Sequence, residues 1–206
     1  LNDIEKEMMA NIKALKDAGK IGKIIVLINT SNALQVDFLK GYEEGKDIYG
    51  VDATLWISGV GQTGLEGIAE VLNGTVSPSG SLPDTYCYNN YSSPVMQNFT
   101  PIQYLEKNKG DLSKIPGHAD TYMIYQEGIY VGYKYYETRY EDYVMGTGNA
   151  GEYAYGNDVA FPFGYGLSYT TFEYSDVTLS YDAAATTYTM KVTVTNTGDV
   201  AGKETV

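Results

Sequence analysis

The amino-acid sequence predicts an α/β fold: an open, mainly parallel sheet with flanking helices, followed by a few antiparallel strands. Two short apolar runs, Lys23–Asn29 and Asp52–Ser58, are typical of strands buried on both faces of a parallel sheet. Segments with helical periodicity lie before and after these runs. Beyond Phe161–Gly166 the apolar residues alternate with polar ones, which indicates antiparallel strands.

The first segment is predicted to be an amphipathic helix. Asn2 is a suitable N-cap, Glu5 stands three residues later as in a capping box, and Gly19 can end the helix. The apolar residues recur at three- and four-residue spacing: Ile4, Met8, Ile12 and Leu15.

The next part of the chain continues this alternation of strands and helices. A short helix is expected around Gln35–Lys40, between the two apolar runs. Gly59–Gly64 leads into a helix over Leu65–Leu72, with Asn73-Gly74 at its end. Helix, strand, helix, strand, helix is the order of an open α/β sheet.

Two long segments carry no regular period. Residues 87–120 are predicted to form an insertion loop, and Gly146–Gly156 forms a second loop. Ile129–Tyr143, between them, is rich in Tyr. We therefore assign residues 1–170, insertion included, to the α/β domain.

Residues 171–206 are predicted to begin a β-sandwich-type domain. Val177, Leu179 and Tyr181 alternate with small polar residues, and a second alternating run extends from Tyr188 to Thr195. A complete sandwich needs around 100 residues, so we expect the domain to be truncated.

Composition and charge exclude several classes of function. Lys and Arg number 14 against 26 Asp and Glu, so the net charge is -12. Such a surface repels phosphate backbones and anionic lipids, so we expect neither nucleic-acid nor membrane binding. With one Cys and one His, the chain can form neither an internal disulfide nor a multi-Cys zinc site. We expect no metal and no cofactor.

Gly59–Gly64 fits the pattern G-x-G-x-x-G, and Asp84 follows twenty residues later. That spacing is typical of dinucleotide binding, with an acidic residue for the ribose. The alternative is a tight strand-to-helix turn. Asp84 follows Pro83 rather than a second strand, and the motif is not on the first strand, so the turn is favoured.

Carboxylates and tyrosines are the remaining candidate functional groups. A glycosidase needs two facing carboxyl groups, which spacing alone cannot reveal, and Glu127 draws attention because it lies between two Tyr-rich stretches. The other carboxylates considered are Glu43, Glu44, Glu137, Glu141, Asp142 and Glu152. Of 21 Tyr, 19 lie between Tyr86 and Tyr188. They suit sugar binding, although packing onto the sheet is the favoured interpretation.

Other motifs have simple interpretations. His118 is expected to be a loop histidine, and Cys87 an inert thiol, because no activating base accompanies it. Four glycosylation sequons start at Asn29, Asn73, Asn90 and Asn98, and they matter in a eukaryotic secretory pathway.

Several stretches, in order, resemble glycoside hydrolase family 3 of the β-glucosidase type. They are Asp52–Thr85, Glu127–Thr138, Phe161–Tyr174 and Val192–Glu204. The first has the family's strand, Trp, Gly-rich loop and helix, and then Ser77-Pro-Ser-Gly-Ser-Leu-Pro-Asp-Thr. Ser77 replaces the usual Asn of the family, and Val60 stands where the family has Pro.

The resemblance implies where the reacting groups of such an enzyme lie. In the family a (β/α)8-type barrel carries the nucleophilic Asp, and the α/β sandwich domain lends an acid/base Glu just before the helix that looks like Asn2–Ala18. A fibronectin type III-like domain follows. Because the chain starts at Leu1 and stops at Val206, we expect a fragment cut at both ends, with no catalytic residue of its own. The Gly59–Gly64 turn then is a structural loop.

The expected function follows from this resemblance. The parent protein would hydrolyse β-glucosides or related β-glycosides by a retaining two-carboxylate mechanism, with substrate bound through the missing barrel. The fragment would be inactive and structural. The alternatives are a non-catalytic carbohydrate-binding or interaction module and a nucleotide-binding domain. Unpaired strand edges also predict a homodimer.

Overall fold

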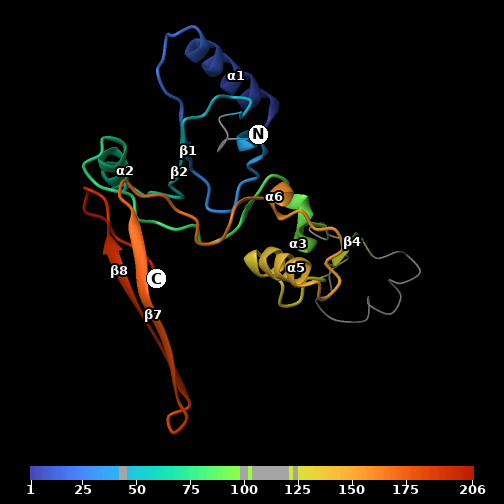
Figure 1. Ribbon diagram of the computed structural model, residues 1–206. Helices are drawn as coiled ribbons and strands as arrows, with labels where there is room; N and C mark the ends of the chain where they lie inside the picture. The colour runs from blue at the N-terminus through green and yellow to red at the C-terminus, as the bar shows by residue number, and fades with distance from the viewer. Residues whose placement is uncertain (42–45, 98–101, 104–120, 123–124) are drawn as a thin grey trace. The chain divides into compact units, whose positions relative to one another are not determined.

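The computed structural model describes residues 1–41, 46–97, 102–103, 121–122 and 125–206 (Figure 1). The chain divides into two compact units. Unit 1 comprises Leu1–Ser58 and Asp84–Phe163, and unit 2 comprises Gly59–Pro83 and Gly164–Val206. The domain boundary near residue 171 stays a prediction.

Unit 1 begins with helix α1, Asp3–Asp17, whose capping box confirms the sequence prediction. The Asn2 side chain accepts a hydrogen bond from the Glu5 backbone at 2.9 Å, and the Glu5 carboxylate accepts one from the Asn2 N–H at 2.8 Å. Met9 is buried, whereas Ile4 is 80% exposed and Met8 is 52% exposed. Much of the predicted apolar stripe therefore faces solvent in this chain.

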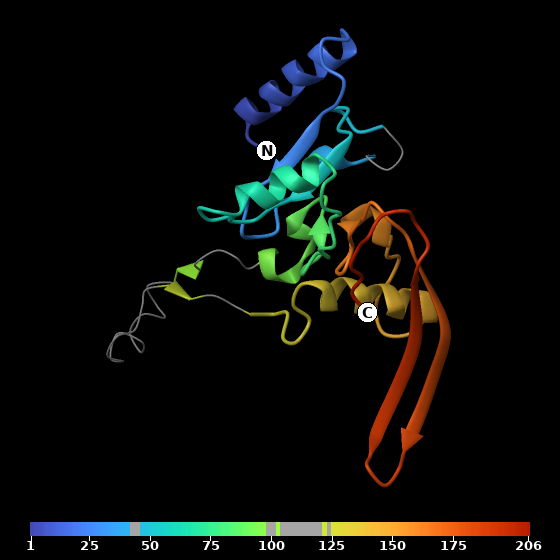
Figure 2. The same cartoon turned by 90° about the vertical axis from the view of Figure 1, so that its left-hand side faces the viewer.

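Strands β1, Ile25–Ile28, and β2, Ala53–Trp56, form a parallel pair in the register Ile25↔Ala53 to Ile28↔Trp56. Figure 2 shows the two strands side by side. The predicted parallel pairing is confirmed for these two strands, and the larger sheet stays a proposal. The prediction that both faces are buried is wrong for β1, because the side chains of Ile25 and Leu27 are 49% and 41% exposed. In the part of the chain that the structure describes, that face of β1 is left without a full covering layer.

The core of unit 1 includes the segment that follows β1. Val36, Phe38 and Leu39 are buried, and the Val36 N–H donates to the Cys87 carbonyl at 3.0 Å. The predicted helix over residues 35–40 is one 3₁₀ turn, η1, Asp37–Leu39. Val36 is the N-cap of this short helix, and its N–H, which has no partner within the helix, bonds to Cys87 instead.

Short elements complete much of the rest of unit 1. They are β3 (Tyr86–Cys87), paired antiparallel with β6 (Val159–Phe161), η3 (Asn90–Ser92), α3 (Pro94–Gln97), β4 (Ile102–Gln103), paired antiparallel with β5 (Thr121–Tyr122), and α6 (Tyr155–Asp158). Most of the predicted insertion loop lies outside the described residues.

Helix α5, Tyr133–Met145, occupies much of the Tyr-rich segment, for which the sequence predicted no helix. It follows Gly132, whose φ of +57° and ψ of -130° suit glycine. A Cβ at Gly132 would lie 2.9 Å from an Asp84 carboxylate oxygen. Asp84 therefore lies at the N-terminal end of α5, where the helix dipole favours a negative charge.

Unit 2 contains helix α2, Leu65–Leu72, and the segment that follows it. Gly74 has φ +80°, as expected past a helix end. The Ser77 hydroxyl lies 2.9 Å from that of Ser168, and the Tyr169 hydroxyl donates to the Val71 carbonyl at 2.8 Å. These bonds attach residues 164–170 to the α2 region.

The predicted antiparallel strands form a hairpin of β7, Phe172–Asp182, and β8, Thr187–Asn196. The register shifts between Ser175 and Thr178, next to Asp176 with φ +52°. This bulge places Tyr174 and Leu179 on one face although their numbers differ in parity. The expected half-burial is wrong, because Leu179 is 70% exposed and Met190 is 65% exposed. Within the described residues of unit 2, β7 and β8 form a single two-stranded sheet, and no complete sandwich is seen.

No helix within the described ranges has the length and apolarity needed to cross a membrane.

Candidate functional site

The carboxyl ends of parallel strands are where open α/β sheets place their ligand sites. In unit 1 this edge comprises the residues after β1 and those after β2. The Trp56 indole N–H donates to the Thr30 carbonyl at 2.9 Å, and the Ile57 N–H donates to the Ile28 carbonyl at 3.0 Å. Trp56 thus joins the two post-strand segments.

Ser58, two residues beyond β2, has φ +49°. A non-glycine residue in this region is uncommon, and strained backbone of this kind gathers at functional sites. The Ser58 side chain is half-buried just beyond the end of β2. Neither Ser58 nor the Trp56 bond was identified from the sequence, although the two strand ends were.

The loop after β1 is fixed at its far end as well. The Asn90 N–H donates to the Gln35 side chain at 3.2 Å, and the Asn90 side-chain amide donates to the Ala33 carbonyl at 3.4 Å. The Thr30 hydroxyl donates to the Asn32 carbonyl at 2.8 Å within the loop. The edge is therefore formed by a defined backbone before any ligand binds.

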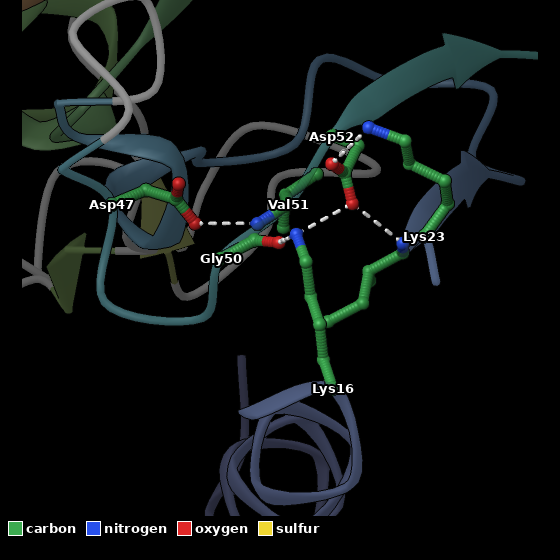
Figure 3. A network of polar contacts seen from close by, with 7 residues as sticks. Lys16, Lys23, Asp47, Gly50, Val51 and Asp52 are labelled. Atoms are coloured by element: carbon green, nitrogen blue, oxygen red, sulfur yellow. Dashed lines mark hydrogen bonds and ion pairs between the residues drawn. The ribbon is translucent and has the colours of Figure 1, made fainter. Parts of the chain in front are cut away.

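A charged network lies at the opposite, amino-terminal ends of the strands (Figure 3). Asp52 accepts hydrogen bonds from Lys16 at 2.6 Å, from Lys23 at 3.0 Å and from the Ile24 N–H at 2.8 Å. Lys16 also donates to the Gly50 carbonyl at 2.6 Å. The hydrogen bond from Lys16, followed by those from Ile24 and Lys23, holds the pKa of Asp52 well below its ordinary value. This network attaches α1 to the strand pair.

The tyrosines of unit 1 form a cluster around Arg139. The Arg139 guanidinium donates to the Tyr135 hydroxyl at 2.7 Å and lies 4.4 Å from the centre of the Tyr153 ring. The Tyr155 hydroxyl donates to a Glu137 oxygen at 2.5 Å. These tyrosines therefore contact other side chains of unit 1, in agreement with the packing role that the sequence analysis favoured over sugar binding.

Cys87 and Tyr136 form the centre of a buried cluster with Val159. Burial raises the pKa of the Cys87 thiol to about 11, so the thiol is protonated at neutral pH and is a poor nucleophile. Burial also raises the pKa values of Tyr136, Tyr153 and Tyr155. The geometry supports the prediction that Cys87 is inert.

The carboxylates considered from the sequence have separate environments. Glu127 is 9% exposed, and its Oε2 has no hydrogen-bond partner within the described part of the chain. Glu137 binds Tyr155, and Asp142 accepts from the Thr147 hydroxyl at 3.1 Å. Glu141 and Glu152 are exposed. Glu43, Glu44 and His118 lie outside the described residues.

The Gly59–Gly64 motif forms a turn that leads into α2. The Gly64 N–H donates to the Val60 carbonyl at 3.1 Å, and a Cβ at Gly64 would collide with that same carbonyl. Glycine is therefore required for the turn itself. Among the residues that the structure describes, no group of three or more His, Cys, Asp or Glu could hold a metal ion.

The parallel pair and its flanking helix define the chain as α/β, and comparison with known proteins identifies the family. The model of the glycosyl hydrolase family 3 C-terminal domain matches residues 2–133. The chain belongs to glycoside hydrolase family 3.

Relatives and solved structures agree with this assignment. The chain is 32% identical over 206 residues, all of its length, to a β-glucosidase of Ruminococcus albus, and covers 17% of that protein. It is 37% identical over 147 residues, 71% of its length, to an exo-α-(1→6)-L-arabinopyranosidase of Bifidobacterium breve, and covers 15% of it. The chain thus spans less than a fifth of the length of these curated relatives.

Among solved structures, β-glucosidase 3B of Thermotoga neapolitana in complex with α-D-glucose is similar with a TM-score of 0.66 and 30% identity. The match covers 96% of this chain and 22% of that one. The resemblance inferred from the sequence motifs is confirmed.

Proposed function

We propose that this chain is part of a glycosidase that hydrolyses β-glucosides or related β-glycosides with retention of configuration. The observation that carries the proposal is the 32% identity over all 206 residues to a β-glucosidase. In the retaining mechanism an Asp attacks the anomeric carbon while a Glu protonates the leaving oxygen, and the Glu then activates water. In this proposal both reacting carboxylates lie outside the 206 residues, and the chain itself is structural.

Exposed apolar side chains of unit 1 are consistent with a structural role for the chain. On α1, Ile4 is 80% exposed and Leu15 is 49% exposed, and on β1 Ile25 is 49% exposed. Exposed apolar side chains of this size are typical of surfaces that contact another protein or domain. We propose that this surface packs against the catalytic barrel of the full-length protein.

An assay with chromogenic glycosides tests the function. The full-length protein should release p-nitrophenol from the β-glucoside, and NMR of the first product should show the β-anomer. An α-L-arabinopyranoside belongs in the panel because a relative is named for that substrate. The 206-residue chain alone should give no turnover. Turnover by the chain alone would refute the placement of the carboxylates, and inversion would refute the mechanism.

We also propose that the isolated chain forms a homodimer through the β7–β8 hairpin. Both strands have an unpaired edge within the described residues, and one face carries exposed Leu179 and Met190. Sedimentation of the isolated chain should show dimers. Met190→Lys should give monomers, whereas Thr189→Lys, on the polar face, should not. A wild-type chain that stays monomeric at every concentration contradicts this.

A further inference from the structure

We infer that the carboxyl edge of β1 and β2 is a binding surface for a neutral sugar in its pyranose ring form. The surface comprises Asn29, Ser31, Trp56 and Ser58. The inference rests on the proposed glycosidase function for its ligand class. Its residues, however, are assigned from the geometry of unit 1.

The edge is held in place by hydrogen bonds to the loop that follows β1. Trp56 bonds to the Thr30 carbonyl at 2.9 Å, so the indole positions the loop after β1. Asn90 fixes the same loop at residues 33 and 35. A surface formed in advance binds ligand without paying for loop ordering, which favours even a weak ligand such as a monosaccharide.

The side chains of this edge retain hydrogen-bonding capacity. Asn29 and Ser31 are exposed and Ser58 is half-buried. None of the three side chains has a hydrogen bond to another residue in the ranges that the structure describes. An amide and two hydroxyls offer both donors and acceptors, which matches the hydroxyl groups of a sugar.

The chemistry of the edge selects against charged ligands. Residues 24–36 and 53–58 contain no Asp, Glu, Lys or Arg, although the chain has 40 such residues among 206. A phosphate or carboxylate would find no cation here to replace its water. The half-buried Trp56 ring adds an aromatic group whose apolar body suits the C–H face of a pyranose, while its N–H stays bonded to the Thr30 carbonyl.

The strain at Ser58 gives the proposal a specific signature. The φ of +49° at Ser58 lowers the stability of the fold, because a side chain at this position is strained. A glycine adopts the same φ without that strain. Ser58→Gly should therefore raise the melting temperature while it removes the hydroxyl that binds the sugar. A strained residue with no role in binding would give a different result: its replacement by glycine would raise the melting temperature and leave sugar binding unchanged.

Trp56 is the sole tryptophan of the chain and reports on its own site. Methyl β-D-glucopyranoside is titrated into the 206-residue chain with selective excitation of the indole. We expect a saturable change in Trp56 emission, and none with mannitol at matched viscosity beyond a linear drift. Glucose 6-phosphate should bind at least tenfold more weakly.

Variants separate binding from folding. By isothermal titration, Ser58→Gly and Ser31→Ala should each weaken glucoside binding about two- to tenfold, the range expected for one hydrogen bond. Ser180→Ala, on the exposed hairpin, is the matched control and should bind like the parent chain.

Three outcomes would overturn the inference: no saturable emission change up to the solubility of the glucoside, equal affinity for the phosphate ester, or unchanged binding by both edge variants. The hydrolysis assay is independent of these results. If the full-length protein hydrolyses glucosides and Trp56 gives no response, the edge site fails alone. If the sugar binds and the full-length protein is inactive, the glycosidase proposal fails alone.

Discussion

The parallel β1–β2 pair and the β7–β8 hairpin differ in what stabilises them. Each strand of the parallel pair has four residues, yet Asp52 at one end and Trp56 at the other attach it to neighbouring segments. The hairpin strands have 11 and 10 residues, and most of their side chains are exposed. Many hydrogen bonds between two strands therefore do not by themselves indicate many tertiary contacts. The two regions differ in the contacts that their side chains make with the rest of the chain.

Truncation of matched leucines should show this difference most strongly. Leu39 is 1% exposed and Leu179 is 70% exposed. Leu39→Ala should lower the free energy of unfolding by about 2–5 kcal/mol, the range for a buried leucine. Leu179→Ala should change it by about 0.5 kcal/mol or less. Urea titrations followed by Trp56 fluorescence and far-UV circular dichroism measure both. Equal losses would show that the hairpin is buried in solution.

The Asp52 network should make the strand pair sensitive to acid. The pKa of Asp52 in the folded chain lies below its ordinary value of 3.8, so the carboxylate stabilises the fold above that pH. Protonation removes this contribution as the pH falls toward the folded pKa. Asp52→Asn should therefore melt at a lower temperature than the parent at pH 7, and the gap should narrow below a pH of about 4.

Asp17→Asn is the control for that experiment. Asp17 pairs with Lys13 at 2.6 Å, but its side chain is 61% exposed. Exposed helix pairs contribute about 0.3–0.5 kcal/mol, so the melting temperature should barely change. A gap between parent and Asp52→Asn that stays constant down to low pH would argue against the network.

The smallest effect is expected at the tip of the hairpin. Thr186 has φ +52°, a conformation that is unfavourable for a β-branched residue. Thr186→Gly should stabilise the hairpin by about 0.5 kcal/mol, after the extra backbone entropy of glycine is counted. Ala184→Gly, which has no such strain to relieve, should not stabilise it. Amide exchange in β8 measures the stability of the hairpin in both variants. Slower exchange in Ala184→Gly but not in Thr186→Gly would contradict the assignment of strain to Thr186.

The sequence predicted the elements whose signals are local. The Asn2–Glu5 capping box, the two apolar strands and the alternating hairpin all depend on neighbours within a few residues. Helix α5 was not predicted because its own Tyr and charged residues are distributed over all of its faces, so its sequence has no apolar stripe that would indicate a buried face.

The candidate site could be predicted less completely. Strand ends follow from the apolar runs, and therefore so does the edge where a ligand site is expected. The Trp56–Thr30 bond joins residues 26 positions apart, and the φ of Ser58 follows from the path of the chain beyond β2. Neither has a local sequence signal, because the same residue types occur in ordinary turns.

The extra residue at the Asp176 bulge affects how this strand should be aligned with others. Hydrophobic residues occupy even positions up to Tyr174 and odd positions from Val177 onward. An alignment that scores strict alternation will split β7 into two short strands. Removal of Asp176 by a one-residue deletion would restore strict alternation and keep Phe172, Tyr174 and Leu179 on one face, so a related strand without the bulge should align with β7 through a one-residue gap at this position.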